Sequence, residues 1–327
     1  MQKTKTSYIG ADLGGTKLLI GEIDCEGNIL RSESTPSGRL DRESACRLTE
    51  DSLAEFMKGK TEGYAPAAIG IGLVGRIDSI AGKWMEIDSA DGGPIPLAER
   101  ISRRFGLPCR IDNDVKSASK AELLFGYGRE YENFVYINVG TGIAAGTVSG
   151  GTLISGGHFN AGEVGHTCSG LDIRIPCICG RDDCVESVAS GIGLDRCARL
   201  LSPRYPESRL TIPKNGRVSA KDIFAMYDSD PLCRVLTDNA AKGLANLIMN
   251  TVRFSDPEII VLGGGLVSDG FLLSLAEKQL SSHTMRYVTG GVRLTRLDPR
   301  YIGVIGAASN AMLELSQTAK TQSQNIH

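Results

Sequence analysis

Apolar and polar positions form two glycine-rich patterns that resemble each other. Residues 8–30 and 134–154 both alternate β-branched residues with polar ones and are interrupted by glycine clusters. Each pattern predicts three strands joined by tight turns, with glycine supplying the positive φ values that hairpins need. Because the two stretches lie about half the chain apart, the repeat predicts two related lobes, each opening with a glycine hairpin.

Helical and buried-strand patterns occupy much of the rest of the chain. Continuous apolar runs predict buried strands within 67–78, 107–112 and 258–265. Apolar residues at helical spacing predict further helices at 41–59, 97–106, 115–125, 231–254, 268–280 and 302–315. The alternation of strands with helices indicates an α/β fold.

Composition and charge narrow the class of partner. The 327 residues are 41% hydrophobic and 23% charged, and the length corresponds to about two domains. A net charge of -2 without a long run of Lys or Arg offers no footprint for nucleic acid or an anionic membrane, so we expect small molecules or other subunits as partners. Neither a signal peptide nor a membrane-spanning run is evident, and we expect a cytoplasmic protein with reduced thiols.

The tips of the two glycine hairpins are candidate phosphate sites. At Asp12-Leu13-Gly14-Gly15-Thr16-Lys17, backbone N–H groups and the Thr16 hydroxyl can approach an anion, and Asp12 can hold Mg²⁺. A tip of this kind is also an ordinary tight turn. Gly140-Thr141-Gly142 supplies a second tip, and two tips facing one cleft would clamp a polyphosphate from both sides. The sequence contains no P-loop motif.

Two further candidates lie where predicted strands end. Gly263-Gly264-Gly265 follows an apolar strand, at the position where α/β proteins bind ligands, although glycine there also eases a turn from strand to helix. Asp114 follows Asp112 and Asn113 at the start of a predicted helix. A carboxylate in that position suits a general base for phosphoryl transfer, and the alternative is a helix N-cap.

Three of the nine cysteines cluster in PCICGRDDCVE, residues 176–186. In a cytosolic protein, Cys177, Cys179 and Cys184 point to a metal or to catalysis before a disulfide. His166 precedes them, and a Cys₃His set matches the ligands of structural Zn²⁺. The sequence contains no CxxC pair, which argues against a redox motif. We expect the six other thiols to be buried or incidental: Cys25, Cys46, Cys109, Cys168, Cys197 and Cys233.

Taken together, these motifs resemble the ROK family, named for repressors, open reading frames and kinases. DLGGTK and VGTGIAAG are similar to its two phosphate motifs, and IDNDVKSASKAE to the stretch with its catalytic aspartate. NAGEVGH followed by CICGRDDCVE is similar to its zinc signature. The resemblance implies an ATP- and Mg²⁺-dependent sugar kinase. It also implies an α/β, two-lobed actin-like (ribonuclease H-like) fold, with ATP and sugar meeting in a central cleft.

The same resemblance leads us to expect a particular division of the chain. A small N-terminal α/β lobe would span 1–112, and a larger C-terminal lobe with the zinc loop would span 113–302. A helix at about 303–318 would pack back on the first lobe and be followed by a frayed tail at 319–327. The resemblance also suggests a homodimer or homotetramer.

Each motif residue receives an implied role. Asp114 would be the base that deprotonates a sugar hydroxyl, most simply the one at C6. Sugar hydroxyls would be held by Gly75, Asn113, Glu163, His166 and Glu186. Phosphates and Mg²⁺ of ATP would be bound by Asp12, Gly14, Gly15, Thr16, Lys17, Gly140, Thr141 and Gly142, and adenosine by Gly264 and Gly265. Structural Zn²⁺ would be held by His166, Cys177, Cys179 and Cys184, which would fix His166 and the loop bearing Glu186 toward the sugar.

Two departures from the family pattern affect specificity and the metal loop. Val74-Gly75 and the segment Asp88–Pro94 replace a Pro-Gly turn and an Asn-Leu-Pro segment. The sugar therefore stays open among glucose, N-acetylmannosamine, N-acetylglucosamine, glucosamine, allose and fructose. Asp183 replaces a glycine before the third cysteine, which we expect only to adjust the loop.

The alternative function is that of a non-catalytic sugar-binding or regulatory ROK protein. A regulator needs a helix-turn-helix module before the first glycine motif, and we expect no room for one because few residues precede Asp12. The presence of Asp114 and of both hairpins favours a kinase over a protein that only binds sugar.

Overall fold

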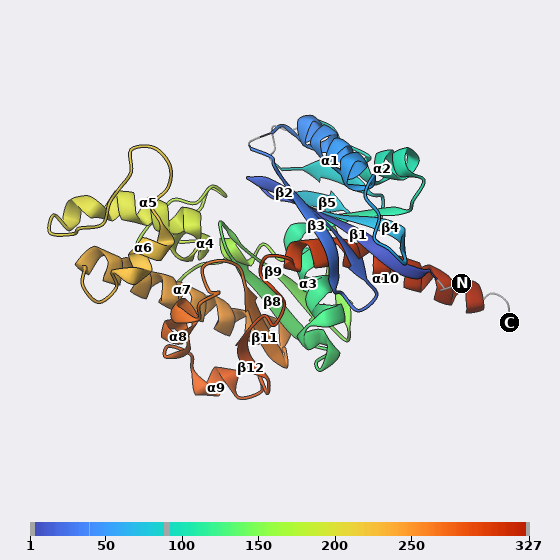
Figure 1. The fold of residues 1–327 in the computed structure, drawn as a ribbon. Coiled ribbons are helices and arrows are strands. Elements are labelled where there is room, and N and C mark those ends of the chain that lie inside the picture. The colour runs from blue at the N-terminus through green and yellow to red at the C-terminus, as the bar shows by residue number, and fades with distance from the viewer. Residues whose placement is uncertain (1–3, 39, 88–91, 325–327) are drawn as a thin grey trace. The chain divides into compact units, whose positions relative to one another are not determined.

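Two compact units, each built on a five-stranded sheet, make up the protein (Figure 1). The computed structural model describes residues 4–38, 40–87 and 92–324, so part of the altered segment Asp88–Pro94 lies outside the described residues. Unit 1 extends to Arg129, includes Ser155–Ala161 and resumes at Arg300, whereas unit 2 comprises Glu130–Ile154 and Gly162–Pro299. Among the helices described, none is long and apolar enough to cross a membrane.

The sheet of unit 1 has the strand order β3-β2-β1-β4-β7. Neighbours are antiparallel from β3 to β1, and β4 and β7 continue the sheet parallel to β1. The strands are β1 (Lys5–Leu13), β2 (Lys17–Asp24), β3 (Ile29–Pro36), β4 (Tyr64–Leu73) and β7 (Cys109–Asn113), with a separate ribbon of β5 (Arg76–Asp78) and β6 (Lys83–Glu86). The helices are α1 (Arg42–Phe56), α2 (Leu97–Phe105), α3 (Asp114–Phe125), η1 (Tyr127–Arg129) and α10 (Ile302–Gln324).

The sheet of unit 2 repeats this arrangement in the order β10-β9-β8-β11-β12. Its strands are β8 (Phe134–Val139), β9 (Ile143–Ser149), β10 (Thr152–Leu153), β11 (Ile259–Gly263) and β12 (Gly291–Leu294), and β8, β11 and β12 are parallel. The helices are η2 (Val164–His166), α4 (Glu186–Ala189), α5 (Gly191–Leu201), η3 (Ser202–Arg204), α6 (Ala220–Ala225), α7 (Pro231–Ser255), α8 (Phe271–Glu277) and α9 (Ser282–Met285). The predicted internal repeat is confirmed, because strand order and strand directions match.

Glycines allow α10 to pack backbone to backbone on the sheet of unit 1. A Cβ atom on Gly10 of β1 would lie 2.1 Å from the carbonyl oxygen of Val304, and one on Gly70 of β4 would lie 1.7 Å from that of Ala307. Helix α10, drawn in red in Figure 1, also packs against α3. Helix α3 thus belongs to unit 1. The expected boundary after residue 112 is therefore wrong, and the first stretch of unit 1 ends at Arg129.

The end of helix α10 and the backbone of the hairpin tips differ from what the sequence predicts. Helix α10 continues through Gln324, past residue 319, where a frayed tail was expected. Positive φ values occur in the second turn of each three-stranded pattern, at Gly27 and at Gly150 and Gly151. The glycines at the hairpin tips (Gly14, Gly15, Gly140 and Gly142) do not have positive φ values, so left-handed geometry is not the reason for glycine there.

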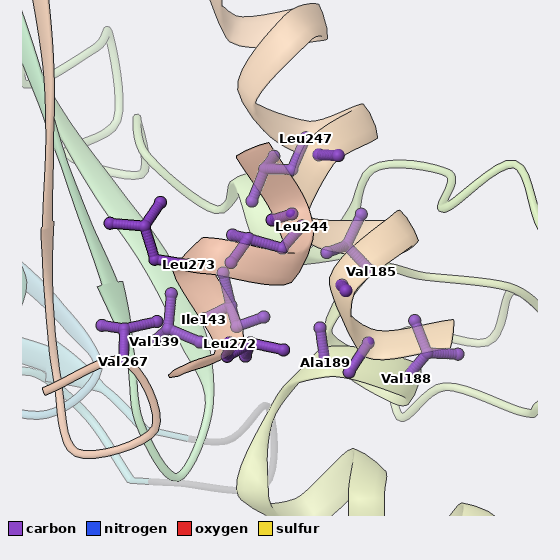
Figure 2. Close-up of a cluster of buried hydrophobic side chains, with 14 of the residues drawn as sticks. Val139, Ile143, Val185, Val188, Ala189, Leu244, Leu247, Val267, Leu272 and Leu273 are labelled. Atoms are coloured by element: carbon purple, nitrogen blue, oxygen red, sulfur yellow. The ribbon is translucent and has the colours of Figure 1, made fainter. Parts of the chain in front are cut away.

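The hydrophobic core of unit 2 supports the end of its sheet that carries candidate residues. Figure 2 shows apolar side chains of the hairpin formed by β8 and β9 packing against those of α4, α7 and α8. Those labelled are Val139, Ile143, Val185, Val188, Ala189, Leu244, Leu247, Val267, Leu272 and Leu273. The tip Gly140–Gly142 and the start of α4 are therefore anchored by buried apolar side chains on both sides.

Candidate functional site

Three adjacent parallel strands bring the candidates of unit 1 to one edge of the sheet. The register pairs Asp12 of β1 with Gly72 of β4, and Gly72 with Asp112 of β7. Because parallel strands end at the same edge, Asp12 in the last two residues of β1 lies at the same edge as Gly75 and Asp114, which follow β4 and β7, and α/β sheets bind ligands at this edge. Gly75 has φ of 95°, and a Cβ there would lie 2.3 Å from the carbonyl oxygen of Glu86, so only glycine fits.

The N-cap of α3 is Asn113, and Asp114 is the first helical residue. The Asn113 side-chain oxygen accepts hydrogen bonds from the backbone N–H groups of Val115 (2.9 Å) and Lys116 (3.2 Å). Its amide nitrogen donates to the carbonyl oxygen of Gly75 at 3.1 Å. The capping alternative considered for Asp114 is therefore wrong, since its neighbour performs that role. Asn113 also ties the turn after β4 to the start of α3.

A buried polar network fixes this junction between β7 and α3. Asp112 is 2% exposed, and its carboxylate accepts hydrogen bonds from the backbone N–H of Asn113 (2.8 Å) and from Nζ of Lys120 (2.6 Å). Lys120 also donates to Asn310 of α10 at 2.9 Å. The Asn310 amide donates to Ser117 (2.9 Å), which donates to the carbonyl oxygen of Asn113 (2.8 Å). The start of α3 is thereby held from β7 and from α10.

Asp12 is a desolvated carboxylate at the end of β1. Burial raises its pKa to about 6, although the charge of Lys17 acts in the opposite direction. A Cβ on Gly303, in the first turn of α10, would lie 2.1 Å from an Asp12 carboxylate oxygen, so the carboxylate approaches the positive end of that helix. The adjacent tip residues Gly14–Lys17 are exposed, and Gly14 N–H donates to the Lys17 carbonyl oxygen at 3.0 Å. A carboxylate beside exposed backbone donors fits a phosphate-bound Mg²⁺.

The corresponding hairpin of unit 2 is held by Glu186 and by the start of α5. The Glu186 carboxylate accepts a hydrogen bond from Ile143 N–H at 2.9 Å, and a Cβ on Gly142 would lie 2.7 Å from the same oxygen. The N–H groups of Gly191 and Ile192 donate to the carbonyl oxygens of Gly140 and Thr141, at 2.9 and 3.1 Å. A side chain at 142 would displace the Glu186 carboxylate from this position. Glu186, a candidate sugar ligand, already contacts the candidate phosphate tip.

Unit 2 contains a pocket of about 510 Å³. Of the residues that line it, the sequence indicated only Gly265 as a candidate. Its walls include the rings of Phe224 and Phe271, whose centroids are 5.8 Å apart, and the charged side chains of Lys221 and Asp269. A Cβ atom on Gly265 would meet open space, whereas one on Gly264 would lie 2.4 Å from the carbonyl oxygen of Val139. The triple glycine thus both turns the chain and borders a cavity.

The sequence contains only part of the signal for this pocket. Ser219 followed three residues later by Asp222 marks a helix start, and the Ser219 hydroxyl does cap α6 by accepting from Asp222 N–H. Nothing in the sequence brings Phe224 to Phe271, because packing of α6 and α8 on α7 creates that contact.

The cysteine loop assembles as a compact cluster in unit 2. The potential ligand atoms of His166, Cys177, Cys179 and Cys184 all lie within 4.8 Å of one another. Nδ1 of His166 is 3.3 Å from the Cys177 sulfur, and the sulfurs of Cys179 and Cys184 are 3.5 Å apart. A hydrogen bond from the backbone of Arg181 lowers the pKa of Cys179 to about 6, which favours a thiolate. Four soft ligands at this spacing fit a tetrahedral Zn²⁺.

The position before the third cysteine explains the Asp183 departure. Asp183 has φ of 60°, a left-handed conformation that glycine adopts without strain and that aspartate tolerates better than most residues. Its carboxylate accepts from the Ile175 N–H at 3.3 Å. The substitution is therefore accommodated within the loop.

The metal cluster and two candidate sugar ligands share one short segment. Nδ1 of His166 lies beside the Cys177 sulfur, and Nε2 lies 3.9 Å from a Glu163 carboxylate oxygen. The segment lies along β9, because the Gly162 carbonyl oxygen accepts from Ala145 N–H at 2.8 Å, and Val185 N–H donates to Thr167 at 2.9 Å. Within unit 2, β9 and the cysteine loop thus hold Glu163, His166 and Glu186 in one neighbourhood.

Comparison with known proteins gives one family and one fold. Residues 8–312 match the ROK family. A glucokinase of Halalkalibacterium halodurans is 30% identical over 83% of this chain and 84% of its own length. An N-acetyl-D-glucosamine kinase of Yersinia pseudotuberculosis is 28% identical over 95% of this chain and 99% of its own.

Solved structures agree with this result. A ROK family glucokinase from Streptomyces griseus, in complex with glucose and AMPPNP, has a TM-score of 0.73 and 26% identity, covering 92% of this chain and 98% of its own. The predicted fold class, the α/β two-lobed actin-like fold of sugar kinases, is therefore confirmed.

Replacing Lys120 tests the buried network directly. Lys120→Met leaves the Asp112 carboxylate buried without its cation, and we expect the free energy of unfolding to fall by about 3 kcal/mol in urea denaturation. The double change Asp112→Asn with Lys120→Met removes both charges and should recover part of this loss. In the control Lys58→Met, at an exposed ion pair, the change should stay below about 1 kcal/mol. Equal losses in the two lysine variants would contradict the role of the network.

Proposed function

The chain belongs to the ROK family, and we propose that it is an ATP- and Mg²⁺-dependent kinase that phosphorylates the C6 hydroxyl of a hexose or amino sugar. The names of its relatives support a sugar as acceptor. The structural observation that carries the proposal is the cap of α3. Asn113, and not Asp114, caps the helix, so the half-buried Asp114 carboxylate lies at the carboxyl edge of the sheet, where its Oδ1 accepts a hydrogen bond from the Val115 N–H at 2.9 Å. A carboxylate held on rigid elements at that edge suits a general base.

On the acceptor side, we assign proton removal to Asp114. A carboxylate accepts the hydroxyl proton as the bond to phosphorus forms, so the sugar oxygen becomes a better nucleophile. Gly75 and Asn113 would hold neighbouring hydroxyls, and their mutual hydrogen bond keeps both in place. Glu163, His166 and Glu186 would hold the remaining hydroxyls, because carboxylates accept hydrogen bonds from hydroxyl groups and an imidazole N–H donates to them.

On the nucleotide side, we assign phosphate binding to the two hairpin tips. Exposed backbone at Gly14, Gly15, Thr16 and Lys17 and at Gly140, Thr141 and Gly142 offers N–H groups to phosphate oxygens. The pocket beside Gly264 and Gly265 would take the adenosine, with Phe224 and Phe271 as apolar walls. Mg²⁺, when bound, neutralises phosphate charge. Asp12 would hold it, since burial disfavours this carboxylate without a cation partner.

The cysteine cluster is proposed as a structural Zn²⁺ site. Four protein ligands fill the tetrahedral coordination of zinc and leave no position for a substrate. Ligation through Nδ1 of His166 would fix the ring so that Nε2 stays directed toward Glu163. The metal would thereby orient sugar-binding groups without taking part in the reaction.

The alternative, a non-catalytic sugar-binding or regulatory ROK protein, is less well supported. A protein that only binds sugar needs neither the two exposed glycine tips nor the aromatic pocket beside Gly265, which the kinase proposal uses for ATP. The expected homodimer or homotetramer and the cytoplasmic location stay predictions.

An assay of ADP release identifies the acceptor. The panel should contain glucose, N-acetylglucosamine, N-acetylmannosamine, glucosamine, allose and fructose, and we expect ATP-dependent turnover with at least one of them. The 6-deoxy analogue of the accepted sugar should release no ADP and should inhibit competitively, since it retains the binding hydroxyls and lacks the acceptor. Turnover of that analogue would exclude C6, and no turnover with any sugar would favour the alternative.

The role of Asp114 is tested by Asp114→Asn. We expect kcat on the accepted sugar to fall by about 10²–10⁴-fold, because the amide cannot accept the proton, while Asn113 still caps the helix and the melting temperature is unchanged. Asp51→Asn, the same change at an exposed ion pair of unit 1, is the matched control and should retain activity. A near-wild-type kcat for Asp114→Asn would refute the assignment.

Zinc removal should affect the two substrates unequally. The purified protein is expected to carry one zinc ion per chain by elemental analysis. Chelation or Cys177→Ser should raise KM for the sugar by about 10–100-fold and change KM for ATP much less, because His166 and the Glu186 loop lose their support. Cys168→Ser, at a thiol outside the cluster of four, should retain zinc and activity. Equal losses for sugar and ATP would mean that the metal only stabilises the whole unit.

A further inference from the structure

Lys116 is a buried cation on the helix that begins with Asp114. It is 3% exposed, and its Nζ donates to the carbonyl oxygens of Phe159 at 2.7 Å and Ser155 at 3.3 Å. Burying an ammonium group is unfavourable unless its N–H groups are satisfied. The two carbonyl oxygens meet this requirement. Both belong to the segment Ser155–Ala161, which is part of unit 1 although the chain on both sides of it is part of unit 2.

The segment Ser155–Ala161 closes on itself where Lys116 binds it. Ala161 N–H donates to the Ser155 carbonyl oxygen at 3.3 Å, so one oxygen receives both the loop closure and the ammonium group. Phe159 has φ of 60°, which is rare for a bulky side chain and costs conformational free energy. The carbonyl group of this strained residue accepts the shorter of the two Lys116 bonds. The ammonium group thus stabilises a conformation that the segment would not adopt alone.

The next residues carry candidate sugar ligands. Gly162 follows Ala161 directly, and its φ of 107° lets its backbone approach β9, where a Cβ would lie 2.0 Å from the Ala145 carbonyl oxygen. Glu163 and then His166 follow within four residues. Lys116 itself lies two residues after Asp114. One side chain therefore connects the helix of the proposed base to the peptide that leads into the proposed sugar ligands.

We propose that Lys116 is a positioning residue for the sugar acceptor, which holds the segment Ser155–Ala161, the peptide that leads into Glu163 and His166, on the helix that carries Asp114. This inference rests on the proposed sugar kinase function. Lys116 does not contact the reacting atoms in this proposal. Its hydrogen bonds to Ser155 and Phe159 determine how well the sugar is held, and ATP binding does not depend on them.

Lys116→Met removes the ammonium group and keeps most of the side-chain volume. We expect KM for the sugar to rise and kcat to fall, each by about tenfold or more, while KM for ATP changes less than about twofold. Because the strained loop loses its anchor, chymotrypsin cleavage after Phe159 should also become faster in the native protein. Lys278→Met, at an exposed lysine of unit 2, is the control for the substitution and should match the wild type.

A rescue separates positioning from simple packing. Lys116→Arg restores a cationic donor but adds volume, so it should recover part of the sugar affinity lost in Lys116→Met. An arginine variant worse than the methionine variant, or equal changes in KM for sugar and ATP, would overturn the inference. If wild-type protein turns over no sugar, the proposed function fails. The chymotrypsin comparison then still tests whether Lys116 anchors the segment, and equal cleavage of wild type and Lys116→Met would refute that as well.

Discussion

The ion pair between Lys120 and Asp112 is the interaction on which the acceptor side of the proposed site depends. Both groups are largely buried, so their charges are stable only while every lone pair and N–H has a partner. Asn310 and Ser117 complete the set and connect strand, helix and the C-terminal helix. Asp114 therefore receives its position from three elements that are distant in sequence. Such a junction holds the Asp114 carboxylate on rigid elements, which is what the proposed role as a general base requires.

The two sheets show how one architecture has been specialised in two ways. Both have an antiparallel hairpin followed by two parallel strands, and both present a glycine tip at the carboxyl edge. In unit 1 that edge carries carboxylates, at Asp12, Asp112 and Asp114. In unit 2 it carries the triple glycine and an aromatic pocket, with the cysteine loop beside it. The repeat supplies equivalent positions in the two units, and different side chains occupy them.

Much of this arrangement was predictable from the sequence, and the exceptions have physical reasons. Hydrophobic periodicity gave the hairpins and most helices, and spacing gave the Cys₃His cluster, because both signals are local. Asn113 and Asp114 are equally good caps by composition, so only backbone geometry distinguishes them. The pocket walls Phe224 and Phe271 meet through packing on α7. Lys116 was hidden because a lysine in a helical pattern is normally solvated, and its partners are backbone carbonyls that any sequence possesses.

The close packing of α10 has a consequence for the nascent chain during translation. Strands β1 and β4 are synthesised before unit 2, yet the helix that covers their glycines is translated only after it. At about 5–20 residues per second, the nascent sheet waits many seconds for its cover. Unit 2 lies between these parts of the chain and can mature in the interval. Until α10 is translated, the face of β1 and β4 that carries Gly10 and Gly70 lacks the helix that packs on it.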